Sequence, residues 1–213
     1  MLLTSFTGAQ STGKSTLLDM CMSMLFGNSE TNAYSIVGRD RWVFIPEVTR
    51  LIKRQYGVNI NEQGADDTQL LILNQHLINT IQFKQNLLNE GKSYMMDRCI
   101  MDGYVYSKYL HNHGRIEDNT MNIAESMYQR LIPSLDAIFY THPEDIPIHD
   151  DGERSIDPQF RDEIIQIYDD VLYGSQKWIV PHNVVVLKGT PSERMSLIKD
   201  LSLIHISEPT RPY

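Results

Sequence analysis

The stretch GAQSTGKST, residues 8–16, decides the fold of this chain. It fits the pattern G-x-x-x-x-G-K-[ST], in which backbone N–H groups curl around a phosphate and the next helix adds partial positive charge. The pattern requires a preceding strand and a following helix, and residues 2–7 and 14–26 have the matching apolar spacings. We therefore expect a nucleotide to be bound by Gly8, Ala9, Gln10, Ser11, Thr12, Gly13, Lys14, Ser15 and Thr16.

Two side chains of this loop have predicted chemical roles. The ammonium of Lys14 reaches the β- and γ-phosphates, and the hydroxyl of Ser15 ligates Mg²⁺. The loop alone does not say whether the phosphate passes to water or to a small acceptor.

Strand and helix patterns alternate along the rest of the chain. Further strand patterns cover residues 42–46, 93–98, 135–141 and 183–189, and several are apolar throughout. Such strands are typical of a parallel sheet that is covered on both faces. We predict an α/β fold: a three-layer α/β/α sandwich around a mostly parallel five-stranded sheet, as in P-loop nucleoside-triphosphate hydrolases.

The longest helical pattern runs from Asp67 to Glu90, and Gly91 is placed to end it. Its predicted apolar stripe consists of Leu70, Leu73, Leu77, Ile81 and Leu88.

The last thirteen residues, LSLIHISEPTRPY, resemble an in-frame translation of a sequencing-library adapter. We therefore expect one kinase-like domain over residues 1–200, with the natural sequence interrupted near Asp200 and residues 201–213 not native. The alternative is an ordinary helix end with a polar tail.

Composition narrows the class of protein. The 213 residues are 41% hydrophobic and carry a formal net charge of −8, which argues against a nucleic-acid partner. No stretch is long and apolar enough to span a membrane, and Cys21 and Cys99 have neither a metal-site spacing nor a disulfide framework. We expect a cytoplasmic protein; the oligomeric state is left open, with a homodimer as one candidate.

Charged side chains follow two of the predicted strands. Glu47 comes after WVFIP, and Asp97 and Arg98 come after SYMM. Ligands of open α/β sheets bind beyond the carboxyl ends of the strands. Asp97 is a candidate to hold Mg²⁺ or to accept a proton, Glu47 is a rival base, and Arg98 is a candidate phosphate ligand. The structural alternative is an ion pair, such as Glu47 with Arg98, that ties the strands together.

Two further arginines lie in DDGERSIDPQFRDEI, residues 150–164. Arg154 and Arg161 are candidates to stabilise the charge that spreads over a transferred phosphoryl group when a loop closes. The alternative is a solvated helix start, with Asp157 as N-cap and Pro158 at the first helical position, and both can hold at once.

With these pieces in order, the chain resembles the AAA-domain small-molecule kinases related to the nicotinamide riboside kinase domain. It is more loosely similar to deoxynucleoside and thymidylate kinases. The matching segments, over roughly residues 1–200, are GAQSTGKST, FIPEVTR, MMDRCIMDGYVYSKYL, DDGERSIDPQFRDEI and VVVLKGTPSER.

The resemblance implies a set of ligands and roles. It implies ATP–Mg²⁺ at the loop, with adenine near Gly189, Thr190 and Pro191. It also implies an acceptor site framed by Glu47, Asp97 and Arg98, and a lid carrying Arg154 and Arg161. Nothing in the acceptor region fixes which acceptor fits. Tyr104, like Tyr106 and Tyr109, is predicted to be packed in the core, with a place in the acceptor pocket near Asp97 as the alternative for Tyr104.

The leading hypothesis is therefore an ATP-dependent phosphotransferase that acts on a nucleoside, a nucleoside monophosphate or a related small acceptor. The catalytic candidates are Lys14, Glu47, Asp97, Arg98, Arg154 and Arg161, with Ser15 and Asp97 as metal ligands. The alternatives are a nucleotide-hydrolysing motor or switch and a nucleotide-sensing module. The late strand is followed by THPED instead of the N-K-x-D of a GTPase, and SYMM ends in Asp97-Arg98 instead of the paired acids of a motor.

Overall fold

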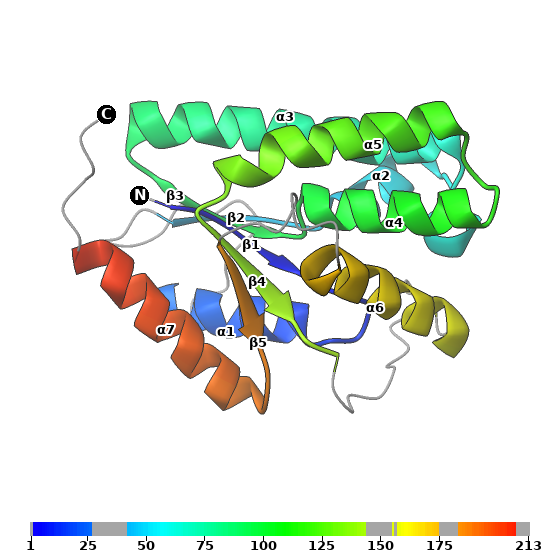
Figure 1. Ribbon diagram of the computed structural model, residues 1–213. Coiled ribbons are helices and arrows are strands. Elements are labelled where there is room, and N and C mark those ends of the chain that lie inside the picture. Colours follow the sequence, from blue (N-terminus) through cyan, green and yellow to red (C-terminus); the bar gives the residue numbers. More distant parts are fainter. Residues whose placement is uncertain (1, 27–41, 144–154, 156, 175–182, 208–213) are drawn as a thin grey trace.

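A five-stranded sheet forms the frame of the molecule (Figure 1). The computed structural model describes residues 2–26, 42–143, 155, 157–174 and 183–207. The strands are β1 (Leu3–Thr7), β2 (Trp42–Ile45), β3 (Ser93–Asp97), β4 (Ala137–Thr141) and β5 (Val184–Leu187). Their order across the sheet is β2-β3-β1-β4-β5, and every neighbouring pair is parallel, so the predicted α/β fold is confirmed.

Helices cover both faces of this sheet. Figure 1 shows α1 and α7 on one face and α3, α4 and α5 on the other, which gives the three predicted layers. The helices are α1 (Lys14–Phe26), α2 (Val48–Tyr56), α3 (Asp66–Glu90), α4 (Ile100–Asn112), α5 (Asp118–Leu131), α6 (Pro158–Tyr173) and α7 (Pro191–Ser207). Single 3₁₀ turns lie at Asn61–Gln63 and Ile132–Ser134.

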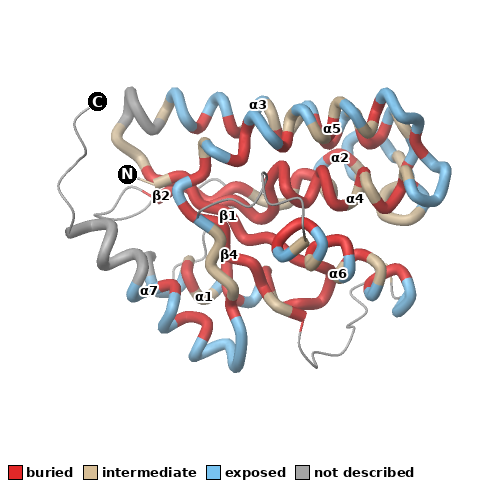
Figure 2. Tube along the Cα trace, in the orientation of Figure 1, coloured by how far each residue is buried: buried red, intermediate tan, exposed pale blue. Residues whose placement is uncertain are grey.

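The strands contribute side chains to two hydrophobic cores, one on each face of the sheet. Successive strand side chains point to opposite faces, so in β3 Tyr94 and Met96 join the core beneath α3, α4 and α5, whereas Met95 joins the core beneath α1 and α7. Burial on both faces explains why β2, WVFI, is apolar throughout instead of alternating, and why even the polar side chains of β1, such as Thr4 and Ser5, are buried (Figure 2).

Local signals set the helix ends, but one apolar stripe was predicted wrongly. Gly91 follows the end of α3 as expected, and Asp157 caps α6 by accepting a hydrogen bond from the Gln159 N–H at 2.9 Å. Ile81 in α3 is 47% exposed, although it was predicted to be buried. The buried side of α3 includes the polar residues Gln69, His76 and Thr80, because tertiary packing against α4 and α5 overrides the hydrophobic period.

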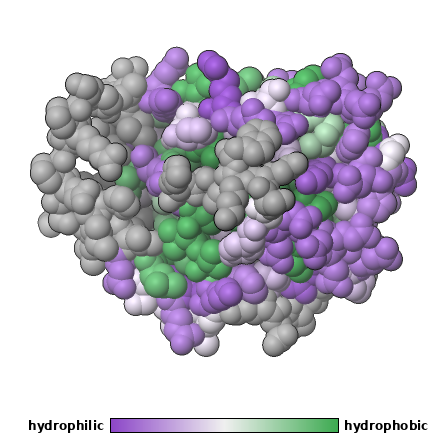
Figure 3. Space-filling view, in the orientation of Figure 1, coloured by the Kyte–Doolittle hydropathy of each residue, from purple (hydrophilic) through white to green (hydrophobic). Residues whose placement is uncertain are grey.

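The surface shown in Figure 3 is mainly hydrophilic, with a hydrophobic patch over β5, whose three valines are half-buried. Within the described residues, no helix is long and apolar enough to cross a membrane. Helix α7 extends to Ser207, seven residues into the segment predicted to be foreign; its origin stays a prediction.

Candidate active site

The loop between β1 and α1 has the backbone of an anion-binding nest. Ser11 (φ 56°) and Gly13 (φ 87°) lie in the left-handed region, and the loop leads directly into the N-terminus of α1. Gly8 has φ 138°, and a Cβ on it would lie 2.6 Å from Thr141 Oγ1 and 2.8 Å from the Thr141 carbonyl oxygen. Only glycine fits there, which lets the loop pass directly against the end of β4.

Lys14 is buried within that loop. Its ammonium donates to the carbonyl oxygens of Gly8, at 2.9 Å, and of Ala9. Burial, followed by the charge of Arg98, lowers the pKa of Lys14 from 10.5 to about 7. An anionic phosphate beside the ammonium would favour its charged form again.

Arg194, a buried residue of α7, is hydrogen-bonded to the phosphate loop. The Arg194 guanidinium donates from Nη1 to the Thr12 carbonyl at 2.9 Å, from Nη2 to the His142 carbonyl at 3.1 Å, and from Nε to the Gly189 carbonyl at 2.9 Å. It therefore links the phosphate loop, the residue after β4 and the loop after β5. The last of these holds the predicted adenine-binding residues Gly189, Thr190 and Pro191.

The loop after β5 is shaped by a capping box. The Thr190 N–H donates to Glu193 Oε2 at 2.7 Å, and the Glu193 N–H donates to Thr190 Oγ1 at 3.3 Å. With Pro191 at the first helical position, this box fixes the start of α7 and the direction in which the loop leaves β5.

Arg98 lies at the centre of a charged cluster beyond the ends of β2 and β3. Its Nε donates to Glu47 Oε1 at 2.7 Å, and its Nη1 donates to Asp102 Oδ1 at 2.8 Å and to the Gly8 carbonyl at 3.4 Å. The other Glu47 oxygen, Oε2, accepts from Arg50 Nε at 2.9 Å. The Glu47–Arg98 ion pair, given above as the structural alternative to a functional role, is thus present, and it borders the phosphate loop.

Arg98 is also held in an unusual backbone conformation. Its φ is 74°, a left-handed value that costs a residue with a side chain about 1–2 kcal/mol. Burial alone would lower the pKa of Arg98, but the Tyr106 phenol and the carboxylates of Glu47 and Asp102 raise it far above its ordinary value. Such strain and charge concentration are typical of functional sites.

Asp97, the last residue of β3, lies beside this cluster. It is 8% exposed, and its Oδ1 is buried without a hydrogen-bond partner. Burial, followed by repulsion from Glu47, raises the pKa of Asp97 from 3.8 to about 6, while Lys14 and Arg98 oppose the rise. A buried carboxylate oxygen with no protein hydrogen-bond partner suits a cation, so Asp97 fits the chemistry of a Mg²⁺ ligand.

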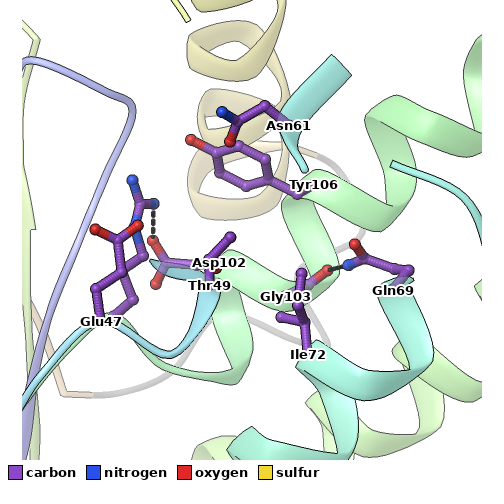
Figure 4. A pocket seen from close by; sticks show the side chains of 9 residues that line it. Glu47, Thr49, Asn61, Gln69, Ile72, Asp102, Gly103 and Tyr106 are labelled. Carbon is purple, nitrogen blue, oxygen red and sulfur yellow. Dashed lines mark hydrogen bonds and ion pairs between the residues drawn. The ribbon is translucent and has the colours of Figure 1, made fainter. Parts of the chain in front are cut away.

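A pocket opens next to the cluster (Figure 4). Its cavity volume is about 20 Å³, room for about one water molecule, so a larger ligand would require its walls to move apart. Its lining residues come from α2, α3, α4 and neighbouring turns: Glu47, Thr49, Asn61, Gln69, Ile72, Arg98, Asp102, Gly103 and Tyr106. Figure 4 shows Glu47 and Tyr106 on separate walls of this pocket, with Asp102 between them. Because Arg98 contacts both the pocket and Gly8, the pocket and the phosphate loop share a wall.

The remaining predictions have mixed outcomes. Arg161 is buried on α6, with no hydrogen-bond partner for Nε or Nη2, and burial lowers its pKa. Arg154 lies outside the described residues. Tyr104 stacks on Tyr128 in the core with ring centroids 4.7 Å apart, as packing predicts; the alternative of a place in the acceptor pocket is wrong for Tyr104, and the tyrosine in the pocket is Tyr106. The described residues contain no cluster of metal-ligating side chains of the kind that binds an ion without nucleotide.

Sequence reasoning missed Asp102, Tyr106, Gln69 and Arg194. Asp102 follows Arg98 by four residues at the start of a helix, so the i,i+4 spacing was a usable signal. Gln69 and Tyr106 lie within helical patterns, and no local signal indicated which way they face.

A strand, a glycine-rich phosphate loop and a helix, with a charged pocket beside them on a parallel sheet, define the class of P-loop nucleotide-binding proteins. The chain matches the model of a family described as AAA domain over residues 4–194. It belongs to this AAA-domain family. No curated protein matches its sequence.

Two solved structures share the fold. Thymidylate kinase from Candida albicans aligns with a TM-score of 0.63 and 17% identity, covering 96% of this chain and 92% of that one. The NadR protein in complex with NR aligns with a TM-score of 0.65 and 14% identity, covering 100% of this chain and 54% of that one. The chain thus spans about half the length of the NadR chain. At these identities the likeness concerns the fold, and the predicted resemblance is confirmed at that level.

Proposed function

We propose that the chain is an ATP-dependent kinase that transfers the γ-phosphate of ATP to a nucleoside, a nucleoside monophosphate or a related small acceptor. The observation that carries the proposal is the pocket lined by Glu47 and Arg98, which shares a wall with the phosphate loop. Hydrolysis needs only a water molecule beside the loop, whereas transfer to an acceptor needs a second binding site at that place. The family match and the two kinase-like folds support the same function.

The residues divide between donor and acceptor. Lys14 and the loop N–H groups hold the phosphates, and Ser15 and Asp97 are the proposed ligands of Mg²⁺, directly or through water. When bound, Mg²⁺ neutralises phosphate charge, which is its usual contribution to phosphoryl transfer. Arg194 keeps the loop in register with the proposed adenine site at Gly189–Pro191.

Glu47 is the better candidate to accept the proton of the acceptor hydroxyl, because it lines the pocket and Asp97 does not. Glu47 Oε1 accepts a hydrogen bond from Arg98 Nε and Oε2 accepts one from Arg50 Nε, and these contacts hold the carboxylate at the wall of the pocket. Arg98 is proposed to bind a charged or polar group of the acceptor, and Arg161, with Arg154, to meet the charge on the transferred group.

The test is an ADP-release assay with ATP–Mg²⁺ and a panel of nucleosides, nucleoside monophosphates and nicotinamide riboside. We expect release to depend on one class of acceptor, and Lys14→Ala to abolish it. Equal release with and without every acceptor would instead identify a hydrolase. Nucleotide binding with no turnover would identify a sensing module.

A further inference from the structure

The Gln69 side chain has a fixed orientation in the wall of the pocket beside the phosphate loop. Its Nε2 donates to the Gly103 carbonyl oxygen at 3.0 Å and to Ser107 Oγ at 2.8 Å. The Ser107 hydroxyl donates to the same Gly103 carbonyl at 2.8 Å, so its oxygen acts as the acceptor toward Gln69. Both N–H groups of the Gln69 amide are therefore used within the protein.

The reverse orientation of this amide is unfavourable. Turning the amide over would place Gln69 Oε1 against the Gly103 carbonyl oxygen, and two acceptors would then face each other without a proton. Figure 4 shows the Gln69 nitrogen directed at Gly103, with the oxygen on the other side of the amide. In the part of the chain that the structure describes, no side chain or backbone group donates to Gln69 Oε1. The pocket wall thus contains one oriented hydrogen-bond acceptor.

Close packing of α3 against α4 keeps this acceptor in place. A Cβ on Gly103 would lie 3.1 Å from Leu73 Cδ2 and 3.4 Å from His76 Cδ2, so the glycine lets the two helices approach closely enough for Gln69 to reach the carbonyl. Leu73 and His76 are both buried. A group that selects a ligand must be held by its neighbours in this way, because a mobile acceptor would adapt to many ligands.

The rest of the lining indicates what kind of donor fits. Ile72 and Tyr106 contribute apolar and aromatic surface to the same pocket, whereas Glu47 and Arg98 form its charged wall next to the phosphate loop. A hydrogen bond among apolar side chains discriminates strongly, because a polar group left unpaired there loses its solvation without replacement. The N–H edge of a planar base suits the Gln69 wall, and the hydroxyl that is phosphorylated suits the charged wall.

A planar base needs more room than the pocket has in this structure, and α2 is the wall best suited to provide it. Helix α2 rests on a small cluster of buried residues, Val48, Ile52 and Ile72, whereas α3 and α4 share the large core. Segments with few buried apolar contacts are the ones that open locally. A shift of α2 would enlarge the pocket without breaking the hydrogen bonds that orient Gln69.

We propose that Gln69 is a specificity-determining residue, which selects acceptors that carry an N–H donor on a planar ring: an imide, a carboxamide or an amino group. It rests on the proposed function and deepens it, since it names the class of acceptor at the same site. An acceptor that presents only oxygen or unprotonated nitrogen there would face Gln69 Oε1 without a proton and would be rejected.

The test is direct binding, measured by calorimetry on the full chain with a non-hydrolysable ATP analogue present. The probes are matched pairs, each as nucleoside and as monophosphate: thymidine and its ring N-methyl derivative, adenosine and its dimethylamino derivative, and nicotinamide riboside and nicotinic acid riboside. In any pair that binds, we expect the member with the N–H to bind roughly tenfold more tightly or better. Equal affinities within the pairs would overturn the role of Gln69 and leave the proposed kinase function standing. Failure of every probe to bind would overturn both.

Two variants test whether Gln69 is the source of the preference. Gln69→Met replaces the amide by an unbranched side chain of similar size, so the preference within a pair should shrink roughly tenfold. Ser107→Ala is the matched control: it also loses the Gln69–Ser107 hydrogen bond, but it keeps Oε1 and the bond to Gly103, so the preference should persist. The ratio of affinities within a pair cancels any general loss of affinity or stability. An unchanged ratio in Gln69→Met would exclude Gln69 as the selecting residue.

Discussion

Arg98 Nη1 lies 2.8 Å from Asp102 Oδ1, and this buried ion pair joins the proposed acceptor pocket to the start of α4. Asp102 is 3% exposed and has four donors: Arg98 and the Tyr168 hydroxyl at Oδ1, and the Thr7 hydroxyl and the Cys99 N–H at Oδ2. The carboxylate is thus fully satisfied, and it holds Arg98 against side chains from β1 and α6. We regard Asp102 as a positioning residue for Arg98.

Asp102→Asn should show this role. One oxygen becomes an NH₂ group that faces donors, and Arg98 keeps Glu47 but loses the more deeply buried of its two carboxylate partners, so the free energy of unfolding should fall by about 3 kcal/mol. Acceptor-dependent turnover should fall because Arg98 moves, while ATP binding should be largely kept. Chemical denaturation, a nucleotide-binding titration and the structure of the variant are the measurements.

The comparison variant is Tyr168→Phe, which removes one of the four donors and leaves the ion pair. It should cost only about 1 kcal/mol and leave Arg98 in place. If Asp102→Asn proves as mild as Tyr168→Phe, the ion pair does not position Arg98.

Stability should vary with pH in opposite senses at two residues. The pKa of Asp97 is raised from 3.8 to about 6, so the folded state binds that proton more tightly and stability falls as pH rises between these values. The pKa of Lys14 is lowered from 10.5 to about 7, so the unfolded state binds the proton more tightly and stability rises with pH across that range. Denaturation midpoints from pH 4 to about 10 would record both limbs.

Single variants test which residue causes each part of the pH dependence: the acid limb, where stability falls as pH rises, and the alkaline limb, where stability rises with pH. Asp97→Asn should flatten the acid limb and stabilise the nucleotide-free protein at pH 7 by roughly 1–3 kcal/mol, because it removes a buried charge. Lys14→Met should flatten the alkaline limb. An acid limb that persists in Asp97→Asn would mean that another carboxylate is responsible.

The sequence was sufficient for the parts of the site that follow strands. The loop motif and the strand-end rule predicted Gly8, Lys14, Glu47, Asp97 and Arg98, because parallel strands must end at the same edge of the sheet. Tyr106 and Tyr168 come from the interiors of helices, where the inward-facing side is set by packing of distant segments, whereas Asp102 lies in the first turn of α4, four residues after Arg98. The misplaced stripe at Ile81 has the same origin, since the buried side of α3 includes polar residues that a hydrophobic period does not reveal.

Gly8→Ala should abolish nucleotide binding. The added methyl group would overlap Thr141 Oγ1 and the Thr141 carbonyl, and φ 138° is a region that residues with side chains avoid. The loop would have to move away from β4, so both ATP affinity and the melting temperature should fall. Gly114→Ala is the matched control: Gly114 also has positive φ, at 64°, but a Cβ there meets nothing within 4 Å.

The control should lose only about 1–2 kcal/mol, the cost of a left-handed backbone, and should bind nucleotide normally. Equal losses of nucleotide affinity at the two positions would mean that backbone strain, and not the Thr141 contact, limits position 8.

Arg194→Lys should distinguish the effect of the three Arg194 hydrogen bonds on the phosphate loop from the effect of its positive charge. Lysine keeps the charge, but its single ammonium cannot reproduce the planar fork that contacts the carbonyls of Thr12, His142 and Gly189. Because two of the three hydrogen bonds would be lost, the free energy of unfolding should fall by about 1–3 kcal/mol, and the melting temperature should fall with it. ATP affinity should also weaken, because the phosphate loop is no longer linked to the proposed adenine site. Calorimetry with ATP and thermal denaturation are the measurements. A loss of stability with unchanged ATP affinity would limit Arg194 to a structural role, because the phosphate loop would then keep its conformation without the Arg194 hydrogen bonds.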